Sequence, residues 1–420
     1  MQVQKVPVQT VSLEHLRSYL REDKSPFILR TSDRILFKRC RRLWGWMSHL
    51  RQGRSIREQA DYLWFGTGIH FALEDFHGLN LYGHPAKAFV AFVEASKRAE
   101  MLPGTWQEHL NLGIAIMSYY ADEWLSCRPS LTTYEVDGIP QVEVNGAIDL
   151  GVRTPDDRRV LYGFTLDRVV VDDWDRLWIV EYKTAKQIRI YHFDVDEQIT
   201  AYCWAAWRLY GVIVAGVVYQ QFRKNIPTLP KILTSGLVST DTRQSTSASL
   251  YAKMLRDMYG VVELAPKANI ITLNKFRQVE DEDQDKFVVR HRIERNQKQL
   301  EAFEQKVILE LEDIANPDLP LYSNATKDCD YMCPMQAACV AMDDGSDWEG
   351  ILNTYSRPST DGLTQREKEQ MKWRTHLPEP REVQLPPEGV QYQQLLGQLL
   401  EEQETHLPPE QVFLEEIGLA

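Results

Sequence analysis

Residues 178–186 read WIVEYKTAK and place a carboxylate and an amine two positions apart in an otherwise apolar, β-rich run. Successive side chains of a strand point to opposite faces, so Glu181 and Lys183 should project from the same face. Burying an ion pair costs desolvation energy that the attraction often fails to recover. The pair is therefore either a surface salt bridge, which contributes little, or part of a reactive site.

The segments on either side of this strand predict an α/β core. The block 131–225 contains two further strand-like runs, VEVNGAIDLGV and YGFTLDRVVVD, separated by turn-forming residues. A helical pattern over 194–211 and a strand-like run over 212–222 follow, whereas residues 11–130 are mostly helical in pattern. A sheet, a helix and a further strand in this order are typical of α/β proteins.

Composition divides the chain into three parts. We expect an N-terminal segment over 1–26, a principal domain over 27–345, and an acidic tail rich in Pro, Gln and Glu over 346–420. The domain contains a polar insertion at about 224–275 with one helix, and then a long charged helix over 280–315. The tail carries the related motifs LPPEGV and LPPEQV. Such tails are typical of flexible or partner-docking segments, so a protein partner is expected there.

The overall composition is that of a soluble, intracellular protein. Of the 420 residues, 43% are hydrophobic and 26% are charged. No apolar stretch approaches the ~20 residues that a bilayer span needs. The N-terminus also lacks the layout of a signal peptide. We therefore expect a cytoplasmic location without membrane contact, where disulfides are rare and clustered thiols indicate metal binding.

Charge is distributed unevenly along the chain, whose formal net charge is −12. Residues 34–57, the basic stripe, contain eight Arg or Lys residues and no Asp or Glu, whereas the segment after Tyr355 has twelve acidic and six basic residues. The stripe is either an ordinary solvated face or a surface that meets phosphates. Trp44 and Trp46, which lie within it, are either core aromatics or platforms on which unpaired bases stack.

A second carboxylate lies one hairpin before Glu181. If the strands around residues 172–176 pair, Asp167 and Glu181 can meet on one sheet face. Two converging carboxylates would bind a hard divalent cation such as Mg²⁺ or Mn²⁺. Lys183 would lie beside this ion, where its charge can orient a water molecule and help to deprotonate it. The alternative is a cross-strand salt bridge without chemistry.

The order and spacing of these residues resemble the PD-(D/E)xK nuclease superfamily, and in particular its RecB-like and Cas4-like (AddB-type) branch. Asp167, thirteen intervening residues, and then Glu181-Tyr182-Lys183 match the superfamily motif. The segment GTGIHFALE resembles a helical motif of the branch in which a His is a metal ligand, which indicates His70. The resemblance covers residues 27–345, with a weaker match in the insertion.

A third motif, QITAY, resembles the Q-x₃-Y motif of that branch and indicates Gln198 and Tyr202, four residues apart on one helix face. Asp149, in GAIDL, imitates the Asp motif by type. We reject it because it lies 32 residues before Glu181 and lacks the single-hairpin connection. The resemblance implies a metal site formed by His70, Asp167, Glu181 and the main-chain carbonyl of Tyr182.

Cysteine spacing predicts a second metal centre. Cys329, Cys333 and Cys339 form a C-x₃-C-x₅-C run, and three thiolates need a fourth ligand to close a zinc or iron–sulfur site. In the nucleases that the chain resembles, a distant upstream cysteine joins three C-terminal ones around a 4Fe–4S cluster, and Cys40 occupies that position. The commoner family spacing is C-x₂-C-x₅-C, so this chain has one extra residue. Zinc remains the alternative.

The two other cysteines, Cys127 and Cys203, are interpreted as core thiols on apolar helical faces. The resemblance implies a restriction-endonuclease-like fold, with a mixed central sheet flanked by helices and its two ends joined by the four-cysteine cluster. It further implies a Mg²⁺- or Mn²⁺-dependent DNA nuclease, an exonuclease on single strands or DNA ends, and a phage origin is compatible. Two alternatives stay open: a catalytically silent DNA-binding accessory protein, and a structural zinc protein.

Overall fold

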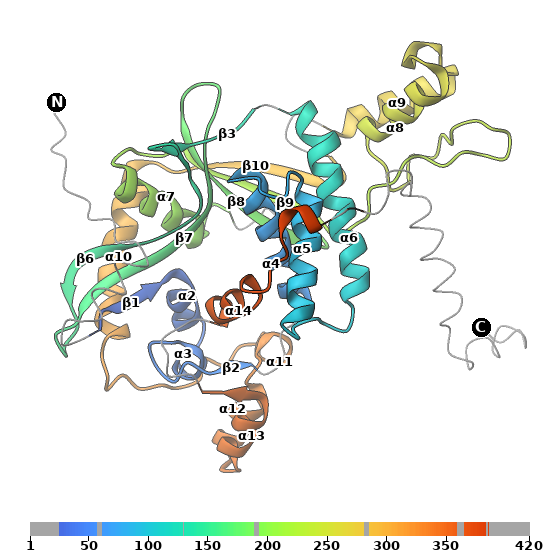
Figure 1. The fold of residues 1–420 in the computed structure, drawn as a ribbon. Helices are drawn as coiled ribbons and strands as arrows, with labels where there is room; N and C mark the ends of the chain where they lie inside the picture. The colour runs from blue at the N-terminus through green and yellow to red at the C-terminus, as the bar shows by residue number, and fades with distance from the viewer. Residues whose placement is uncertain are drawn as a thin grey trace, which may run out of the picture.

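The computed structural model describes residues 25–56, 61–128, 130–188, 193–280, 285–358, 365–383 and 385 (Figure 1). Within these residues, no helix is both long and apolar enough to cross a membrane. The chain folds around one mixed sheet with helices packed on both of its faces, as the order of predicted elements indicated.

Strand β7 (Arg159–Val171) organises this sheet, because it pairs along both of its edges. One edge pairs antiparallel with β6 (Val142–Arg153) and the short β3 (Thr132–Thr133). The sheet continues from the other edge in the order β7, β8, β9, β10, with β8 and β9 parallel. The bounds of these strands are Leu177–Ala185, Gly216–Arg223 and Val288–Glu294.

The edge of β7 that faces β8 is shared by two strands. Its first half pairs in parallel with β1 (Phe27–Arg30), and this pairing ends at Gly163. Its second half pairs with β8 from Arg168 onward. The ladder is therefore interrupted between Gly163 and Arg168, and Asp167 lies at the end of this interruption. A side chain there can be reached from outside the sheet.

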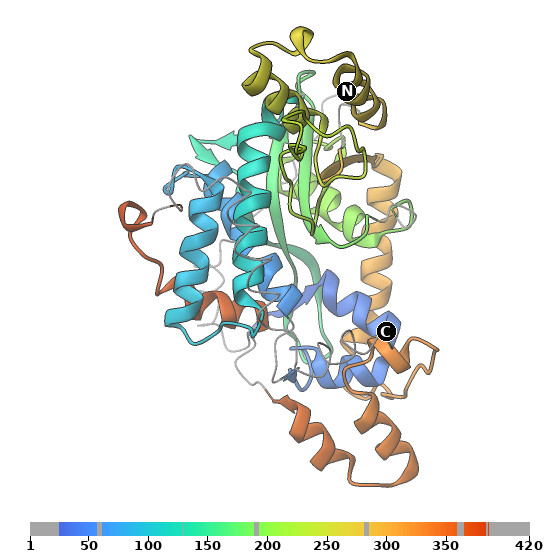
Figure 2. The same ribbon diagram turned by 90° about the vertical axis from the view of Figure 1, so that its right-hand side faces the viewer.

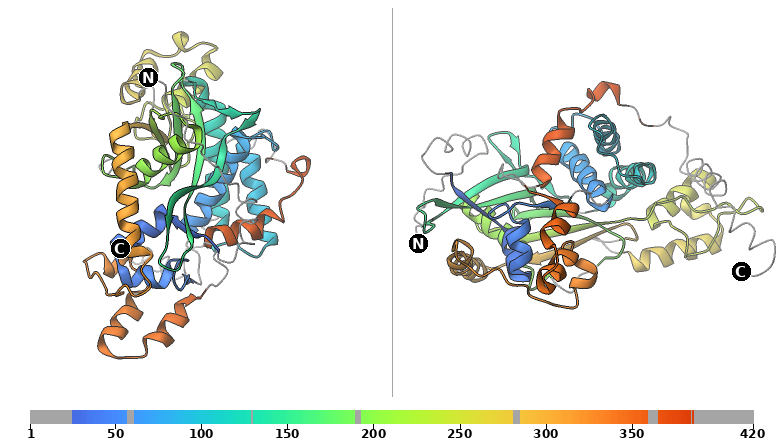
Figure 3. Two further views of the ribbon diagram at one scale, coloured as in Figure 1. Left: turned by 90° about the vertical axis from the view of Figure 1, so that its left-hand side faces the viewer. Right: turned by 90° about the horizontal axis from the view of Figure 1, so that it is seen from below.

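Helices cover the sheet in two layers, which lie on opposite sides of it in Figures 2 and 3. One layer contains α4 (Asp61–His77), α5 (Pro85–Arg98) and α6 (Trp106–Ser118), and its core cluster includes Val180 and Val218 from the sheet. The other layer contains α2 (Thr31–Arg39), α7 (Glu197–Tyr210) and α10 (Gln297–Ile314), and its core cluster includes Ile179 and Val217. The alternation along β8 and β9 assigns each side chain to one layer.

Close packing of α4 on α5 depends on a glycine. A Cβ atom at Gly68 would come within 2.6 Å of the Phe92 ring and 2.7 Å of Phe89. No real Cβ makes such contacts, so a larger residue would push the helices apart. Because His70 follows Gly68 by two positions, this packing also fixes where the histidine meets the sheet.

Smaller units lie around this core. The insertion after β9 contains α8 (Ala248–Tyr259) and α9 (Lys267–Val279) with a cluster of its own. Another unit, the cysteine lobe, lies at the opposite end in Figure 1. It consists of α3 (Arg41–Met47), α11 (Cys329–Met332), α12 (Gln336–Asp344) and α13 (Trp348–Tyr355), with β2 (Ser55–Ile56) paired to β11 (Ser356–Arg357). A small hairpin, β4 (Glu135–Val136) with β5 (Ile139–Pro140), precedes β6.

Several boundaries differ from the sequence-based expectation. Strand β1 lies inside the block expected to be helical, and its four residues are too few for a periodicity to be read. The insertion has two helices instead of one, and it extends to β10. Residues 288–294 form β10, whereas a helix was predicted from 280; among the described residues of that range, the helix begins at Gln297. The run VVRHRIE is charged but alternates, and pairing with β9 decides its conformation.

The acidic tail was expected from residue 346, but packed residues continue beyond that position. Helix α14 (Gln365–Arg374) packs on α5, and Trp373, only 2% exposed, lies in the core against the rings of Phe71 and Phe92, with centroids 5.1 and 5.0 Å away. Arg374 forms an ion pair with Glu74 of α4. The segment is polar in overall composition, and this composition gave no sign that Trp373 is buried in the core. The motifs LPPEGV and LPPEQV fall almost entirely outside the described residues.

Most of the basic stripe is occupied inside the protein. Arg34, fully buried, donates to Glu310 at 2.6 Å and to Glu197 at 3.1 Å. Five further residues of the stripe contact other parts of the chain. Acidic side chains pair with Lys38, Arg41 and Arg42. Main-chain carbonyls accept from Arg51, and the side chains of Asn353 and Ser356 accept from Arg54. Trp44 and Trp46 are 0% and 4% exposed. The stripe therefore joins parts of the fold, and the two tryptophans are core aromatics, not base-stacking platforms.

Candidate metal and nuclease site

Strands β7 and β8 separate where the predicted acids lie. Their last ladder pair is Arg168 with Val180, one residue short of Asp167 and Glu181. Beyond it, the Asp167 carboxylate accepts a hydrogen bond of 2.9 Å from the main-chain N–H of Tyr182. Asp167 and Glu181 are 5% and 2% exposed. The hairpin thus brings both carboxylates together, as the sequence indicated, and burial limits their freedom.

On the next position of the same face, the Lys183 amine contacts the Glu181 carboxylate and forms an ion pair with it. The side chain of Lys183 remains 37% exposed, so the amine is held by Glu181 but reaches solvent. Helix α7 contributes two further groups. Gln198 donates to the Tyr202 hydroxyl at 2.5 Å, and that hydroxyl donates to Glu181 at 3.4 Å. Gln198 and Tyr202 thus contact each other from one face of α7, and Tyr202 also contacts Glu181 of the sheet.

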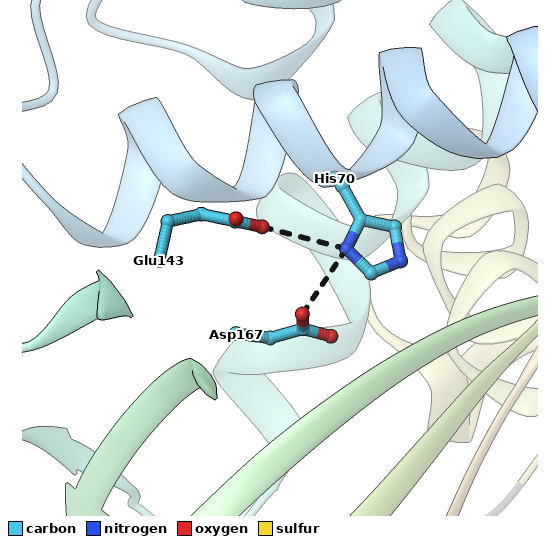
Figure 4. A group of neighbouring side chains, drawn as sticks. All are labelled: His70, Glu143 and Asp167. Carbon is cyan, nitrogen blue, oxygen red and sulfur yellow. Dashed lines mark ion pairs between the residues drawn. The ribbon is translucent and has the colours of Figure 1, made fainter. Parts of the chain in front are cut away.

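Helix α4 adds His70 to the site (Figure 4). Its Nδ1 lies 3.4 Å from Oδ1 of Asp167 and 3.6 Å from Oε1 of Glu143 on β6. Ligand atoms of His70, Glu143 and Asp167 all lie within 4.8 Å of one another. Helix α4 and the consecutive strands β6 and β7 thus converge on one point, and each contributes one potential ligand for a metal ion.

Glu143 was not predicted from the sequence. Its neighbours Val142 and Val144 pair with Arg168 and Leu166, so Glu143 lies opposite Asp167. Counting from the Arg153–Arg159 pair at the hairpin end would place Asn145 there instead, and a register shift between Asp149 and Arg153 changes the partner. The alternation of β6 could have assigned Glu143 to the correct face, but its backbone φ of 46° has no sequence signal. A non-glycine residue in this left-handed region is uncommon.

Burial and neighbouring charges shift the pKa values of the site in different directions. Burial together with the charge of Asp167 raises the pKa of Glu181. Burial opposes the charged form of His70, but Asp167 and Glu143 outweigh it and raise the pKa of the imidazole. Burial likewise opposes the charged forms of Asp167 and Lys183, yet opposite charges lower the pKa of Asp167 and raise that of Lys183. The site concentrates negative charge that a cation can neutralise.

Two buried atoms of the site indicate what such a cation would contact. Oε2 of Glu181 has no hydrogen-bond partner, and Nδ1 of His70 makes no contact closer than its ion pairs of 3.4 Å with Asp167 and 3.6 Å with Glu143. A buried polar atom without a partner is rare in folded proteins, and a bound ion can satisfy such an atom. Carboxylate oxygens are the ligands that Mg²⁺ and Mn²⁺ prefer, while imidazole nitrogen binds transition-metal ions. The donor set of His70, Glu143 and Asp167 therefore fits a divalent cation, whereas Glu181, which the resemblance implied as a ligand, is not a member of that group.

Asp149, which imitates the Asp motif by type, lies farther along β6. It forms an ion pair with Arg159 and accepts a hydrogen bond of 2.9 Å from the main-chain N–H of Gly151. It is not a member of the His70 group. Its carboxylate is engaged at the hairpin end.

The cysteine lobe gathers residues from both ends of the domain. Cys40 lies between α2 and α3, and it packs with Cys333 and Cys339 against one cluster formed by Leu43, Trp46, Met335, Ala338 and Leu352. Burial raises the pKa of Cys333, and the nearby thiols of Cys329 and Cys339 raise it further. All four cysteines are free of disulfides. The fold thus brings Cys40 to the lobe that holds the other three despite their separation in sequence.

Hydrogen bonds reach three of these sulfurs. The main-chain N–H of Asn324 donates to Cys40 and that of Thr326 to Cys329, each at 3.5 Å, and the Arg42 guanidinium donates to Cys339 at 3.1 Å. Such donors stabilise thiolates. A zinc ion with four Zn–S bonds of ~2.3 Å would hold its sulfurs about 3.8 Å apart. Of the residues that the structure describes, no three cysteines bring their sulfurs within 4.8 Å of one another.

The remaining cysteines differ from each other. Cys203 on α7 is fully buried in the core, as expected. Cys127, also expected in the core, is exposed and lies in the 3₁₀ turn Leu125–Cys127. The α-helical spacing that would bury Cys127 is interrupted by a π-helical stretch at Tyr119–Trp124. A π-helical stretch has more residues per turn, so the residues after it point in other directions than an uninterrupted α-helix would give them.

Residues 33–340 match the PD-(D/E)XK nuclease superfamily model. A search of curated proteins finds no match to the chain. The matched range contains every site residue described above, together with the four cysteines; it begins after β1 and ends before α13 and α14.

Proposed function

Since the chain belongs to the PD-(D/E)XK nuclease superfamily, we propose that it is a Mg²⁺- or Mn²⁺-dependent deoxyribonuclease whose site lies between β6, β7, β8 and α4. The observation that carries this proposal is the convergence of His70, Glu143 and Asp167 beside Glu181. The buried Oε2 of Glu181, which has no hydrogen-bond partner, supports the binding of a cation at this point.

In this proposal, His70, Asp167, Glu181 and the main-chain carbonyl of Tyr182 hold the cation, and Glu143 is an additional ligand. A bound divalent cation supplies Lewis-acid polarisation of the phosphate and lowers the pKa of water. The ammonium of Lys183 orients the attacking water and stabilises negative charge that develops at the phosphate. The Tyr182 amide fixes the rotamer of Asp167 through its 2.9 Å hydrogen bond.

Gln198 and Tyr202 have a positioning role in this proposal. The hydrogen bonds from Gln198 to Tyr202 and from Tyr202 to Glu181 restrain the carboxylate that also binds Lys183. Restraining a ligand in this way keeps the reacting groups aligned, and loss of such a contact usually costs 10- to 100-fold in activity or metal affinity. This arrangement favours catalysis over a silent DNA-binding role, because each group expected for hydrolysis is present and oriented.

We further propose that Cys40, Cys329, Cys333 and Cys339 hold a 4Fe–4S cluster. The N–H and guanidinium donors at three sulfurs support thiolate ligands. A four-iron cube is larger than a single ion, so it accommodates sulfurs that are spread more widely than a tetrahedral zinc site requires. The assignment to the RecB-like and Cas4-like branch rests on this cysteine pattern together with His70 and the Gln198–Tyr202 pair.

The test of the proposed activity uses linear and circular DNA. We expect the purified protein to degrade end-labelled linear DNA when Mg²⁺ or Mn²⁺ is added, and to be inactive after chelation. Circular single-stranded DNA should resist if the enzyme is an exonuclease, because it has no end. Cleavage of circular and linear DNA at equal rates would show that the enzyme is an endonuclease and not an exonuclease. Absence of cleavage with any divalent metal would contradict the proposal.

A matched pair of variants separates the site from the rest of the protein. Asp167→Asn removes a proposed ligand and should abolish cleavage, since groups that act as one unit fail together. Asp149→Asn changes an acid that is bound to Arg159 outside the site and should retain cleavage. Similar activity in both variants would indicate that nuclease activity comes from a contaminant.

A further inference from the structure

Three basic residues follow or end the parallel strands β8 and β9, just beyond Lys183. The Lys224 main-chain N–H donates to the Ala185 carbonyl at 2.9 Å, and Ala185 is the register partner of Arg223. Lys186 directly follows Ala185. At a rise of ~3.3 Å per residue, Lys186 lies roughly 10 Å along the chain from Lys183. We name Lys186, Arg223 and Lys224 the strand-end cluster.

The charges of this cluster are not neutralised by the protein. Within the described residues, no acid forms an ion pair with Lys186, Arg223 or Lys224, whereas most of the basic stripe is paired. Nε of Arg223 is buried and has no hydrogen-bond partner. Burial and the charge of Lys186 lower the pKa of Lys224, which indicates that the two amines are close enough to repel each other.

Packing holds Lys224 in this unfavourable position. Its amine lies 4.9 Å from the centroid of the Phe65 ring on α4, the helix that carries His70. A cation above an aromatic face is attracted to it, but this contact provides no counter-charge. Lys224 is half-buried beside the exposed charge of Lys186, and a half-buried charge next to a like charge destabilises a fold unless an anion joins them. A polyanion that passes the catalytic residues would meet this requirement.

We propose that Lys186, Arg223 and Lys224 bind backbone phosphates of the DNA strand whose neighbouring phosphodiester lies at Lys183. This inference rests on the proposed nuclease function and extends it by naming the surface that positions the substrate. It replaces the basic stripe, most of whose described side chains are engaged within the fold, as the phosphate-binding surface. Phosphate contacts supply affinity without reading the sequence, so the surface is expected to be indifferent to base identity.

Binding measured without metal tests the surface independently of catalysis. The anisotropy of a fluorescent single-stranded oligonucleotide, titrated in chelator at several KCl concentrations, gives both affinity and salt dependence. Each phosphate contact on single-stranded DNA contributes about 0.7 to the slope of log K against log salt. The Lys186→Gln/Lys224→Gln variant should therefore lose about 1.4 from this slope and bind at least about tenfold more weakly at low salt. Lys224→Arg should retain the wild-type slope.

Lys38→Gln is the matched control, because it removes one charge from the basic stripe, where Lys38 is paired with Glu197 and Glu310. Its affinity and slope should equal those of the wild type. In Mn²⁺, the double variant should raise KM for DNA far more than it lowers kcat, and thermal melting should show that it is folded.

The outcomes separate this inference from the proposed function. Wild-type affinity and slope in the double variant would overturn the phosphate surface while leaving nuclease activity untouched. A larger loss in Lys38→Gln than in the double variant would also overturn it. If the wild type binds DNA through the cluster but never cleaves it, the surface is supported and the proposed nuclease function fails.

Discussion

Glu143 lies opposite Asp167 on the neighbouring strand, and both carboxylates approach the same nitrogen of His70, at 3.6 and 3.4 Å. Glu143 reaches this position with a backbone φ of 46°. A left-handed backbone costs a residue with a Cβ roughly 1–2 kcal/mol. Strained residues of this kind cluster at functional sites, where the surrounding structure maintains them. The pairing with Asp167 accounts for why the strain is kept.

Substitution of Glu143 should therefore separate stability from metal binding. Glu143→Gly relieves the backbone strain, which outweighs the loss of the 3.6 Å ion pair with His70, so the free energy of unfolding should rise by up to about 1 kcal/mol. The same variant should bind Mn²⁺ at least about tenfold more weakly, because a ligand is lost. Glu143→Gln should lose metal affinity without gaining stability, since its φ remains unfavourable. Chemical denaturation and Mn²⁺ titration measure the two effects.

Asp149→Asn is the control on the same strand, and it should leave the Mn²⁺ affinity unchanged. Mn²⁺ binding by Glu143→Gly at wild-type affinity would remove Glu143 from the ligand set. A large loss of stability in that variant would show that the Glu143 side chain holds the strands together.

A cysteine substitution tests the second metal centre. Cys40→Ser should reduce the iron and sulfide content of anaerobically purified protein, bleach its visible absorbance and lower its melting temperature, because a ligand that links distant parts of the chain is lost. Cys127→Ser changes an exposed thiol outside the lobe and should alter none of these quantities. Stoichiometric zinc with no visible absorbance in the wild type would contradict the iron–sulfur assignment.

The packing of α14 moves the expected limit of the stable domain. Trp373→Ala should lower the free energy of unfolding by about 3–5 kcal/mol, since it empties a space between Phe71 and Phe92. A chain that ends after residue 385 should melt like the full-length protein, whereas one that ends after residue 345 should be destabilised as Trp373→Ala is. Equal melting temperatures for both truncations would show that α14 contributes nothing to the fold.

Local patterns were sufficient for much of the site. Glu181 and Lys183 share a face because alternation fixes side-chain direction in a strand, and a single hairpin brings Asp167 to them. The helical spacing of Gln198 and Tyr202 likewise predicted that their side chains meet. These inferences need only the geometry of one element or of two adjacent ones.

Features that depend on contacts between residues far apart in the sequence could not be predicted from local patterns. The position of Glu143 follows from a register shift and an unusual φ, neither of which has a residue signature here. The basic stripe was a candidate phosphate surface because Glu310, which neutralises Arg34, lies 276 positions away. Trp373 was hidden in a polar segment, and its burial depends on a pocket formed by α4 and α5.

The central claim is that the cluster around Asp167 hydrolyses DNA with a bound metal ion and Lys183 as the activating group. The most direct measurement is the Mn²⁺-dependent cleavage rate of end-labelled DNA by the wild type and by Lys183→Met, combined with Mn²⁺ binding by both. We predict metal-dependent cleavage by the wild type, and a loss of at least about 10²-fold in Lys183→Met with Mn²⁺ affinity retained. Cleavage by Lys183→Met at the wild-type rate, or a wild type that binds Mn²⁺ without cleaving DNA, would contradict it.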